Sequence, residues 1–336
     1  MTDPNHCGNS PGCGISARQL GALALTTAGL PIFRLCCRIS WSWVLLGGLA
    51  AAGTLSALTA VINRHRAKAG RCPSAKPPKG MACASEHSSP ALHAGPHRGP
   101  GAERACTGAD EVASDQRTGQ RFLWALAPFL LTGAVITAWE TTYSFPETAG
   151  NLLAAALVLA LSAAAAYSGP AAAGRCASIL LWVTGALYGT VLLFSLRSLR
   201  TQWLVPAGEP LDALKVWAAL TLPGAALCLA PALQSKQRLP HWPWWAAAGL
   251  AAAASAVTGG ILSPALAREP EAFRTLATGV SVLGVVRRFE ALVNGAMLMS
   301  GFALCALYLV AFAELLSISG DRKKARKKLR KSQKKC

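Results

Sequence analysis

The chain has 336 residues, of which 52% are hydrophobic and 14% are charged, and its mean hydropathy is +0.36. Soluble chains carry charge on about 25% of their residues, so this chain has too few charges to cover the surface of a soluble globular protein. Its apolar residues occur in long blocks, and about 20 such residues cross the hydrocarbon core of a bilayer. We therefore expect an all-α integral membrane protein and not a soluble enzyme.

The apolar blocks predict eight transmembrane helices after a polar lead of residues 1–17. Two spans lie in residues 18–63 and the others in residues 121–318: about 20–35, 41–62, 122–139, 151–168, 176–196, 213–233, 243–263 and 290–316. The apolar segment 275–286 is too short to cross. We expect it to be either a re-entrant or interfacial piece or the start of the last helix.

Residues 64–120 interrupt the hydrophobic pattern. They are rich in Pro, Gly, Ser, Lys and Arg and have almost no aliphatic residues, so they cannot bury enough apolar surface to fold. We expect a disordered, basic cytoplasmic loop. Its His and Cys residues have irregular spacing, and no Cys pair in the chain has the CxxC spacing of a metal site. We therefore expect no metal and no cofactor.

The loops also predict an orientation. Positive charge that would keep loops in the cytoplasm falls on one side of an eight-span chain, at Arg64, Arg66, Lys68, Arg71, Arg175, Lys236, Arg238 and the tail 319–336. Acidic residues fall on the other side, at Glu140, Glu147, Glu209, Asp212, Glu269 and Glu271, together with the exceptions Arg34, Arg38, Arg197 and Arg200. Both termini of this multi-pass protein are therefore expected on the cytoplasmic side of a cell membrane.

The net charge of +18 has two interpretations. A nucleic-acid-binding protein would present a folded basic face with interleaved aromatic residues, and no such module is visible. A cluster of Lys and Arg just beyond the last span favours contact with anionic membrane lipids or an anchor of topology. We expect lipids, and no nucleic acid, as partners of the tail.

Two spans contain Gly and Pro in matching positions of the two halves of the chain. The first has Thr26, Thr27, Gly29 and Pro31, and the sixth has Thr221, Pro223 and Gly224. Breaks of this kind free backbone groups near the bilayer midplane, where transporters bind substrates and ions. These seven residues are the candidate ligand-binding site, although Gly and Pro can also simply kink a membrane helix.

Other candidates for chemistry are few. Arg287, Arg288 and Glu290 begin the last span, and Glu290 would lie in its first turn, where a carboxylate suits the helix dipole. The spans contain no paired carboxylates, and the chain has no GxSxG, HExxH or phosphate-binding loop. We expect no catalytic residues and no enzymatic activity.

Several short motifs resemble one known family. The opening Ile15-Ser16-Ala17-Arg18-Gln19-Leu20, followed by Gly29-Leu30-Pro31, is similar to the start of the spore germination permeases, the transporter-like membrane subunits of nutrient germinant receptors. Trp41 and Trp43 match the aromatic position after the first span of that family. The segments 166–170 and 174–177 resemble its fourth-to-fifth connection, and 285–292 resembles the opening of its eighth span.

The resemblance implies a fold and a function. The family belongs to the amino acid–polyamine–organocation transporter superfamily, so we expect an inverted-repeat bundle with discontinuous helices one and six. A small amino-acid-like germinant would bind between spans one, three, six and eight, and the partners would be other germinant-receptor subunits. Two features depart from the family, which has about ten spans and no long polar loop. The position of a family acidic residue in the sixth span is filled by Thr221 or a neighbour.

A second hypothesis stays open. The near absence of charge within the spans, the Ala-rich helices and the shortened repeat favour a structural or assembly subunit of a membrane complex. Such a subunit would have a degenerate transporter fold and would bind no ligand.

Overall fold

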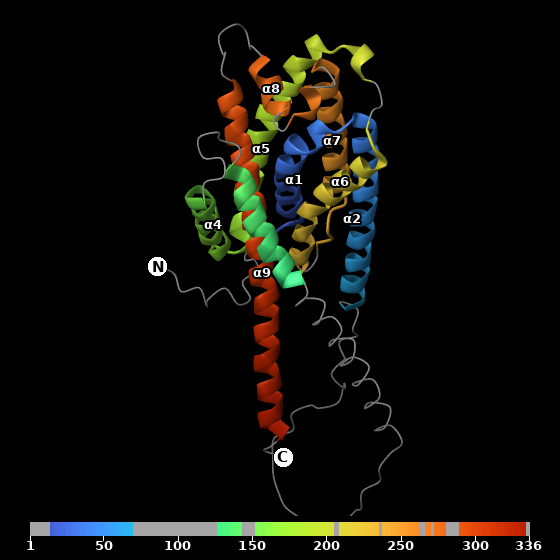
Figure 1. The fold of residues 1–336 in the computed structure, drawn as a ribbon. Coiled ribbons are helices and arrows are strands. Elements are labelled where there is room, and N and C mark those ends of the chain that lie inside the picture. The colour runs from blue at the N-terminus through green and yellow to red at the C-terminus, as the bar shows by residue number, and fades with distance from the viewer. Residues whose placement is uncertain are drawn as a thin grey trace, which may run out of the picture. The chain divides into compact units, whose positions relative to one another are not determined.

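The computed structural model describes residues 14–69, 126–142, 152–204, 208–234, 237–262, 266–269, 272–279 and 289–333. The chain divides into one compact unit of residues 1–63 and 127–336 and a second unit of residues 64–126. Of the second unit, the described residues are only 64–69 and 126. The first unit holds the helical bundle drawn in Figure 1.

The described residues are almost entirely helical. The α-helices are α1 (Ala17–Arg34), α2 (Trp41–Ala69), α4 (Leu152–Tyr167), α5 (Pro170–Ser195), α6 (Pro210–Thr221), α7 (Trp242–Ile261), α8 (Ala272–Gly279) and α9 (Phe289–Gln333), and residues 126–142 are also helical. The 3-10 helices are η2 (Cys36–Arg38), η4 (Leu196–Ser198), η5 (Thr201–Trp203), η6 (Leu222–Ala232) and η7 (Leu266–Arg268). The described residues also contain one isolated β-bridge, between Ile15 and Leu233.

Six helical segments within the described residues are long and apolar enough to cross a membrane. They are Ala17–Arg38, Trp41–Ala67, Pro170–Ser198, Pro210–Ala232, Trp242–Ile261 and Phe289–Ser317. The expectation of an all-α membrane protein is confirmed at this level. The two other predicted spans correspond to the helical residues 126–142 and to the shorter apolar helix α4, so the count of eight stays a prediction.

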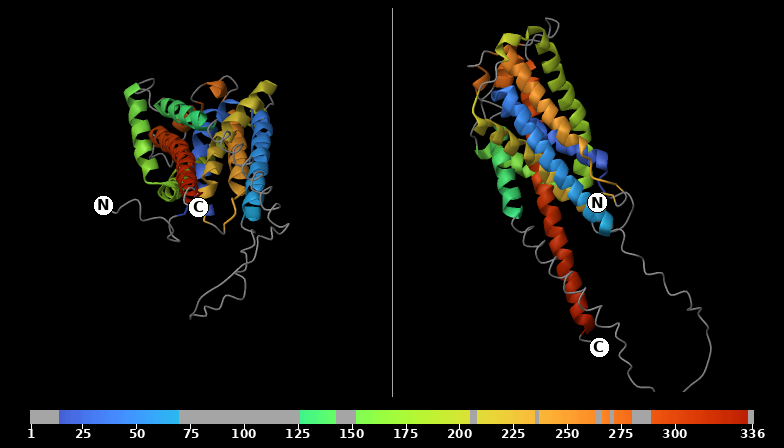
Figure 2. Two further views of the ribbon diagram at one scale, coloured as in Figure 1. Left: turned by 90° about the horizontal axis from the view of Figure 1, so that it is seen from below. Right: turned by 90° about the vertical axis from the view of Figure 1, so that its right-hand side faces the viewer.

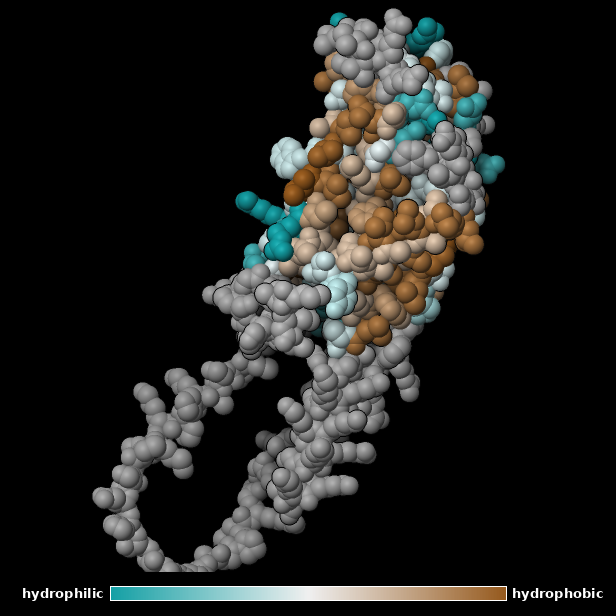
Figure 3. Space-filling view, turned by 90° about the vertical axis from the view of Figure 1, so that its left-hand side faces the viewer, coloured by the Kyte–Doolittle hydropathy of each residue, from teal (hydrophilic) through white to brown (hydrophobic). Residues whose placement is uncertain are grey.

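Apolar side chains cover much of the outside of the bundle. The large exposed ones include Leu153 on α4, Trp182 on α5 and Phe129 in the helix 126–142, which are 77%, 82% and 74% exposed. Figure 3 shows one face of the molecule, where apolar residues cover much of the coloured surface. An apolar surface of this extent suits hydrocarbon and not water.

Helix α1 lies in the middle of the bundle, with α9 and α2 to either side (Figure 2). In the most apolar stretch of α1, 83% of the residues are buried. In the corresponding stretch of α5, 22% are buried. A capping box begins the helix, because Gln19 N donates to Ser16 Oγ (3.2 Å) and Ser16 N donates to Gln19 Oε1 (2.9 Å). These bonds satisfy donors that a helix start leaves free.

Contacts at the helix ends fix the directions of the helices. The start of α1 bonds to the residues before α7, through Ala17 N and Gln237 Oε1 (2.5 Å). The α2 residue Asn63 pairs with Leu239 at the same place. The helices α1, α5 and α7 therefore begin at one end of the bundle, which we call the basic end, and α2 and η6 finish there.

The helix 126–142 gives the direction of α9. Its residue Glu140 lies beside Arg34 at the far end of α1. A Cβ atom at Gly133 would touch Tyr308, and one at Gly301 would touch Thr141. The helix 126–142 therefore runs parallel to α1 and antiparallel to α9. Helix α9 reaches the basic end and continues beyond the bundle (Figure 1).

The predicted break of the first span at Gly29 to Pro31 is wrong. Helix α1 is continuous through these residues and ends at Arg34, where Leu35 N bonds to Pro31 O (3.0 Å). Proline removes one helical hydrogen bond, since it has no N–H, but tight packing on all sides of α1 keeps the helix intact. The discontinuity lies a turn later, at Leu35 and η2.

The sixth span does change its helix type at the predicted place. Helix α6 ends at Thr221, and η6 continues from Leu222 with Pro223 in its first turn and Pro231 within it. Proline cannot supply the N–H of a regular α-helix, and 3-10 runs of more than three or four residues are uncommon. The chain is therefore discontinuous in helix type within this span.

The remaining boundaries differ in detail from the expected ones. Helix α2 continues past the expected loop start at 64 to Ala69, and α9 continues through most of the expected tail to Gln333. The short helix α8 is separate from α9, and its second half overlaps the segment 275–286 that was expected to be re-entrant, interfacial or the start of the last helix. The polar lead up to residue 13, most of the expected loop (70–120) and the pair Arg287 and Arg288 lie outside the described residues.

Candidate functional site

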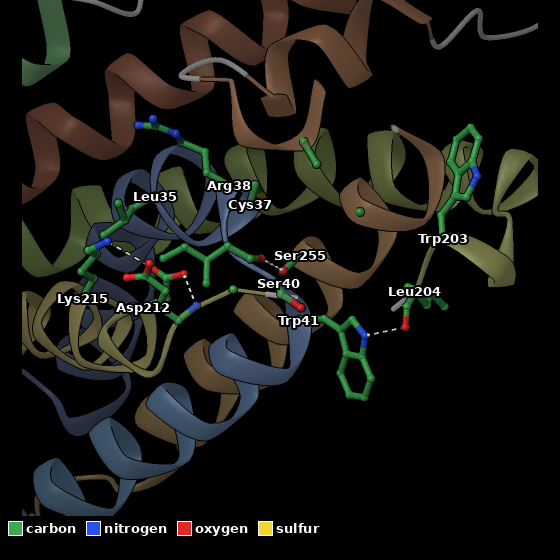
Figure 4. A pocket seen from close by; sticks show the side chains of 15 residues that line it. Leu35, Cys37, Arg38, Ser40, Trp41, Trp203, Leu204, Asp212, Lys215 and Ser255 are labelled. Atoms are coloured by element: carbon green, nitrogen blue, oxygen red, sulfur yellow. Dashed lines mark hydrogen bonds and ion pairs between the residues drawn. The ribbon is translucent and has the colours of Figure 1, made fainter. Parts of the chain in front are cut away.

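The bundle contains a cavity of about 610 Å³ at the end opposite the basic end. Five segments line it: the turn from α1 through η2 to α2, the end of η5, the start of α6, α7 and η7. Its lining residues are Leu35, Cys37, Arg38, Ile39, Ser40, Trp41, Trp203, Leu204, Gly208, Glu209, Asp212, Lys215, Ser255, Gly259 and Ala267. Figure 4 shows this cavity, which we call the end pocket.

Two hydrogen bonds hold the wall of the end pocket in place. Ser255 Oγ on α7 donates to the carbonyl of Ile39 (2.5 Å), and Trp41 Nε1 on α2 donates to the carbonyl of Leu204 (3.2 Å). Both acceptors lie in irregular backbone, where carbonyls lack helical partners. The turn that follows α1 is thus tied to α7, and the start of α2 is tied to the segment after η5.

Charges of both signs line the end pocket. Lys215 Nζ is 2.8 Å from Asp212 Oδ1, and Asp212 Oδ2 accepts a hydrogen bond from Glu209 N (3.3 Å). The guanidinium of Arg38 points away from this pair in Figure 4 and is exposed. The described residues form no ion pair with Arg38. The lining of the pocket thus includes two carboxylates and a lysine at the start of α6, and an exposed arginine on η2.

This arrangement suits a small solute that carries both an amine and a carboxylate. A carboxylate attracts an ammonium group, and an arginine can bind a carboxylate through two parallel hydrogen bonds. The indole rings of Trp41 and Trp203 add apolar surface, as in most small-molecule sites. The volume lies within the range of about 300–1,000 Å³ that is usual for ligand pockets.

The predicted residues of the first span lie deeper in the bundle, and all four are buried. Thr26 Oγ1 is within hydrogen-bonding distance of the carbonyls of Ala22 (2.8 Å) and of Ala177 on α5 (3.1 Å). Thr27 Oγ1 donates to Ala24 O (2.9 Å). Both hydroxyl groups are therefore engaged with backbone carbonyls.

Gly29 lies where α1 contacts both α5 and α9. A Cβ atom there would lie 2.7 Å from Ser300 Oγ on α9 and 3.4 Å from the ring of Tyr188 on α5. Tyr188 OH and Ser300 Oγ are 3.4 Å apart. Small residues allow membrane helices to approach in this way, so the glycine serves helix packing in this structure.

Three aromatic rings pack together in the core next to Gly29. Phe33 of α1 stacks on Tyr188 with ring centroids 3.8 Å apart and lies 4.4 Å from Phe273 of α8. The three side chains are buried. They fill the space around Phe33, next to the turn that leads to the end pocket.

The residues of the sixth span lie in a different environment. Thr221 Oγ1 donates to Ala218 O within its own helix (2.7 Å) and Pro223 is buried. A Cβ atom at Gly224 would lie 2.7 Å from Leu55 of α2. The hydroxyl groups of Thr26, Thr27 and Thr221 therefore form no hydrogen bond between the predicted residues of the first span and those of the sixth. Gly224 faces α2 and not α1.

Glu290 lies in the first turn of α9, as the sequence predicts. It also forms an ion pair with Arg274 of α8, a partner that was not predicted from the sequence. The described residues contain no group of three or more His, Cys, Asp or Glu side chains that could hold a metal ion.

The end pocket was not predicted from the sequence. Its charged residues Asp212, Lys215 and Arg38 follow or precede apolar blocks, where their charges indicate only a side of the membrane. The sequence Gly208-Glu209-Pro210 before an apolar run is a helix-start signal that could have placed carboxylates at a helix end. Nothing in the sequence shows that this end faces η2.

No protein-family model matches the chain, and none of the curated proteins matches it significantly.

Proposed function

We propose that this protein is a spore germination permease-like membrane protein that binds a small, amino-acid-like nutrient germinant in the end pocket. One observation carries the proposal: the residues that line the pocket of about 610 Å³ include the carboxylates of Glu209 and Asp212 and the cations of Lys215 and Arg38. The short motifs of the sequence supply the family, and the discontinuity at η2 supplies irregular backbone beside the pocket. Other germinant-receptor subunits would be its partners in the spore membrane.

The proposal includes the finer architecture. The chain crosses the membrane eight times, with both termini in the cytoplasm and the end pocket on the outer side. The directions of the helices support this count, since the helix 126–142 runs parallel to α1, and α4 packs against α9 and α5. In this arrangement a nutrient arriving from outside meets the end pocket first.

A second function has its own supporting observation. The crossing of α1, α5 and α9 at Gly29 is closely packed, and the hydroxyls of Thr26 and Thr27 bond to backbone carbonyls. A core whose central hydroxyl groups are engaged in this way favours a structural subunit that binds no ligand. The two functions differ in whether any small solute stabilises the protein.

Thermal unfolding of the purified protein, with each of the common amino acids in turn, separates them. A ligand present at about 100 times its Kd stabilises the native state by about 2.7 kcal/mol. We expect one amino acid to raise the Tm, and Asp212→Asn to remove most of that rise. Glu269→Gln is the matched control, since Glu269 is an exposed carboxylate outside the pocket lining.

The outcomes differ clearly. A Tm shift that Asp212→Asn abolishes and Glu269→Gln preserves supports the end pocket as the binding site. The absence of any shift, in protein whose unfolding is cooperative, supports the structural subunit. A shift that survives Asp212→Asn contradicts the assignment to this pocket.

A further inference from the structure

Three exposed arginines gather at the basic end of the bundle. Arg18 lies in the first turn of α1, Arg175 lies near the start of α5, and Arg238 shortly precedes α7. None of them forms an ion pair in the described part of the chain, and Glu314 of α9 forms none with them. At the opposite end, Arg34, Lys215 and Arg274 each pair with a carboxylate, whereas the described residues form no ion pair with Arg38, Arg197 or Arg200.

Backbone and side-chain contacts bring the three arginines to one place. Ala17, the neighbour of Arg18, bonds to Gln237, the neighbour of Arg238. A Cβ atom at Gly174, the neighbour of Arg175, would lie 2.8 Å from Ile15 and 3.0 Å from Gln19. Each arginine is thus one residue away from a tight contact around the start of α1. We call this group the arginine cluster.

Aromatic side chains lie next to the arginine cluster. Trp242 and Trp245 in the first turn of α7 are each 49% exposed. Trp242 also packs on α1, since a Cβ atom at Gly21 would lie 2.9 Å from its ring. Arg18 precedes Gly21 by three residues and therefore shares its helix face. Exposed tryptophans at the start of a span are typical of the membrane–water interface.

The position of the cluster indicates its partner. The helices α1, α5 and α7 are all candidate spans and all begin at this end, so their first turns lie at the level of lipid headgroups. A guanidinium group binds a phosphate through parallel hydrogen bonds, and its stem can stay in apolar surroundings while its head reaches the interface. Basic residues near an anionic membrane surface are attracted to it.

We infer that the basic end is a binding surface for anionic phospholipids, with the arginine cluster holding the phosphate-bearing headgroup and Trp242 and Trp245 contacting the upper acyl chains. The chemistry recognised is a phosphodiester that carries net negative charge and is attached to an apolar chain. This surface is at the other end of the bundle from the end pocket and is independent of nutrient binding.

The test uses the full chain in a neutral detergent and measures its thermal stability with three additives. Phosphatidylglycerol presents the charged headgroup on acyl chains, phosphatidylcholine presents acyl chains without net charge, and glycerol phosphate presents the anion alone. We expect a saturable rise in Tm with phosphatidylglycerol only. An equal rise with phosphatidylcholine would overturn the role of charge, and a rise with glycerol phosphate alone would show a free-anion site instead of a lipid site.

Two matched variants locate the surface. Arg18→Gln with Arg238→Gln removes two charges from the cluster, and Arg197→Gln with Arg200→Gln removes two from the opposite end. We expect the first pair to weaken phosphatidylglycerol binding at least fivefold and the second to leave it unchanged. Equal loss in both pairs, or no loss in the first, contradicts the inference.

Discussion

Tyr188 of α5 stacks on Phe33 of α1 and lies with its hydroxyl 3.4 Å from Ser300 of α9. One side chain thus contacts both the central helix and the last span. Gly29, a turn before Phe33, allows the three helices to approach. The core of this protein therefore depends on one glycine and one tyrosine at a three-helix crossing, and this dependence can be tested directly.

Gly29→Ala should destabilise the protein by about 1–3 kcal/mol, the usual cost of overpacking a core, because the new methyl group would lie 2.7 Å from Ser300 Oγ. Thermal or denaturant unfolding of the purified protein measures the change. Gly295→Ala, on α9, is the control, since a Cβ atom there meets nothing within 4 Å. It should be neutral or slightly stabilising, as alanine favours helices over glycine.

A second substitution checks that the steric clash is the cause. Ser300→Gly removes both atoms nearest to the new methyl group, so the double variant Gly29→Ala with Ser300→Gly should be less destabilised than the sum of the two single variants. Additive losses would show that Gly29 and Ser300 do not constrain each other.

Ser255→Ala should destabilise the turn that forms the wall of the end pocket. The Ser255 hydroxyl on α7 donates to Ile39 O in the turn between η2 and α2. Removal of this hydroxyl leaves the carbonyl unpaired, at a cost of about 1–3 kcal/mol. Ser178→Ala is a matched control, because the Ser178 hydroxyl bonds to Gly174 O within its own helix (2.9 Å), where the carbonyl has a backbone partner. Similar losses in both variants would contradict a special role for the Ser255 bond.

Arg34→Ala should cost more stability than Glu140→Ala. The Arg34 guanidinium pairs with the Glu140 carboxylate (3.3 Å) and also donates to the Glu140 backbone carbonyl. Loss of the carboxylate leaves the carbonyl bond, and a partly exposed ion pair contributes about 0–1 kcal/mol. Loss of Arg34 removes both contacts. Unfolding at low and high salt checks the prediction, since only the Glu140→Ala loss should disappear in high salt; the reverse order of the two losses would refute it.

Labelling of single cysteines tests the proposed orientation. In a background without other cysteines, Ser198→Cys introduces an exposed thiol at the end-pocket side, and His241→Cys introduces one at the basic end. A membrane-impermeant maleimide should label position 198 in intact cells, and should label position 241 only after the membrane is opened. Labelling of position 241 in intact cells would show that the orientation is the reverse of the proposed one. This conclusion does not depend on whether the end pocket binds a ligand.

Asp212→Asn carries a prediction for specificity as well as for binding. If Asp212 attracts the amine of the ligand, the variant should lose at least tenfold in affinity for the amino acid but little for the corresponding acid without an amine. Calorimetric titration of both compounds into the wild type and the variant measures this difference. An equal loss for the two compounds would show that Asp212 acts on the shape of the pocket and not on the amine.

The sequence by itself determined that this is a helical membrane protein, because spans of about 20 apolar residues have few stable alternatives in lipid. It also predicted the position of Glu290 in a first helical turn and an interruption of the α-helix near Pro223, since both depend on local backbone chemistry; the interruption takes the form of a change to a 3-10 helix. Only the tertiary structure decided that α1 is continuous through Pro31, because packing around a buried helix outweighs one missing hydrogen bond. The end pocket and the arginine cluster were likewise decided by packing, since each joins residues from helices that are distant in the chain.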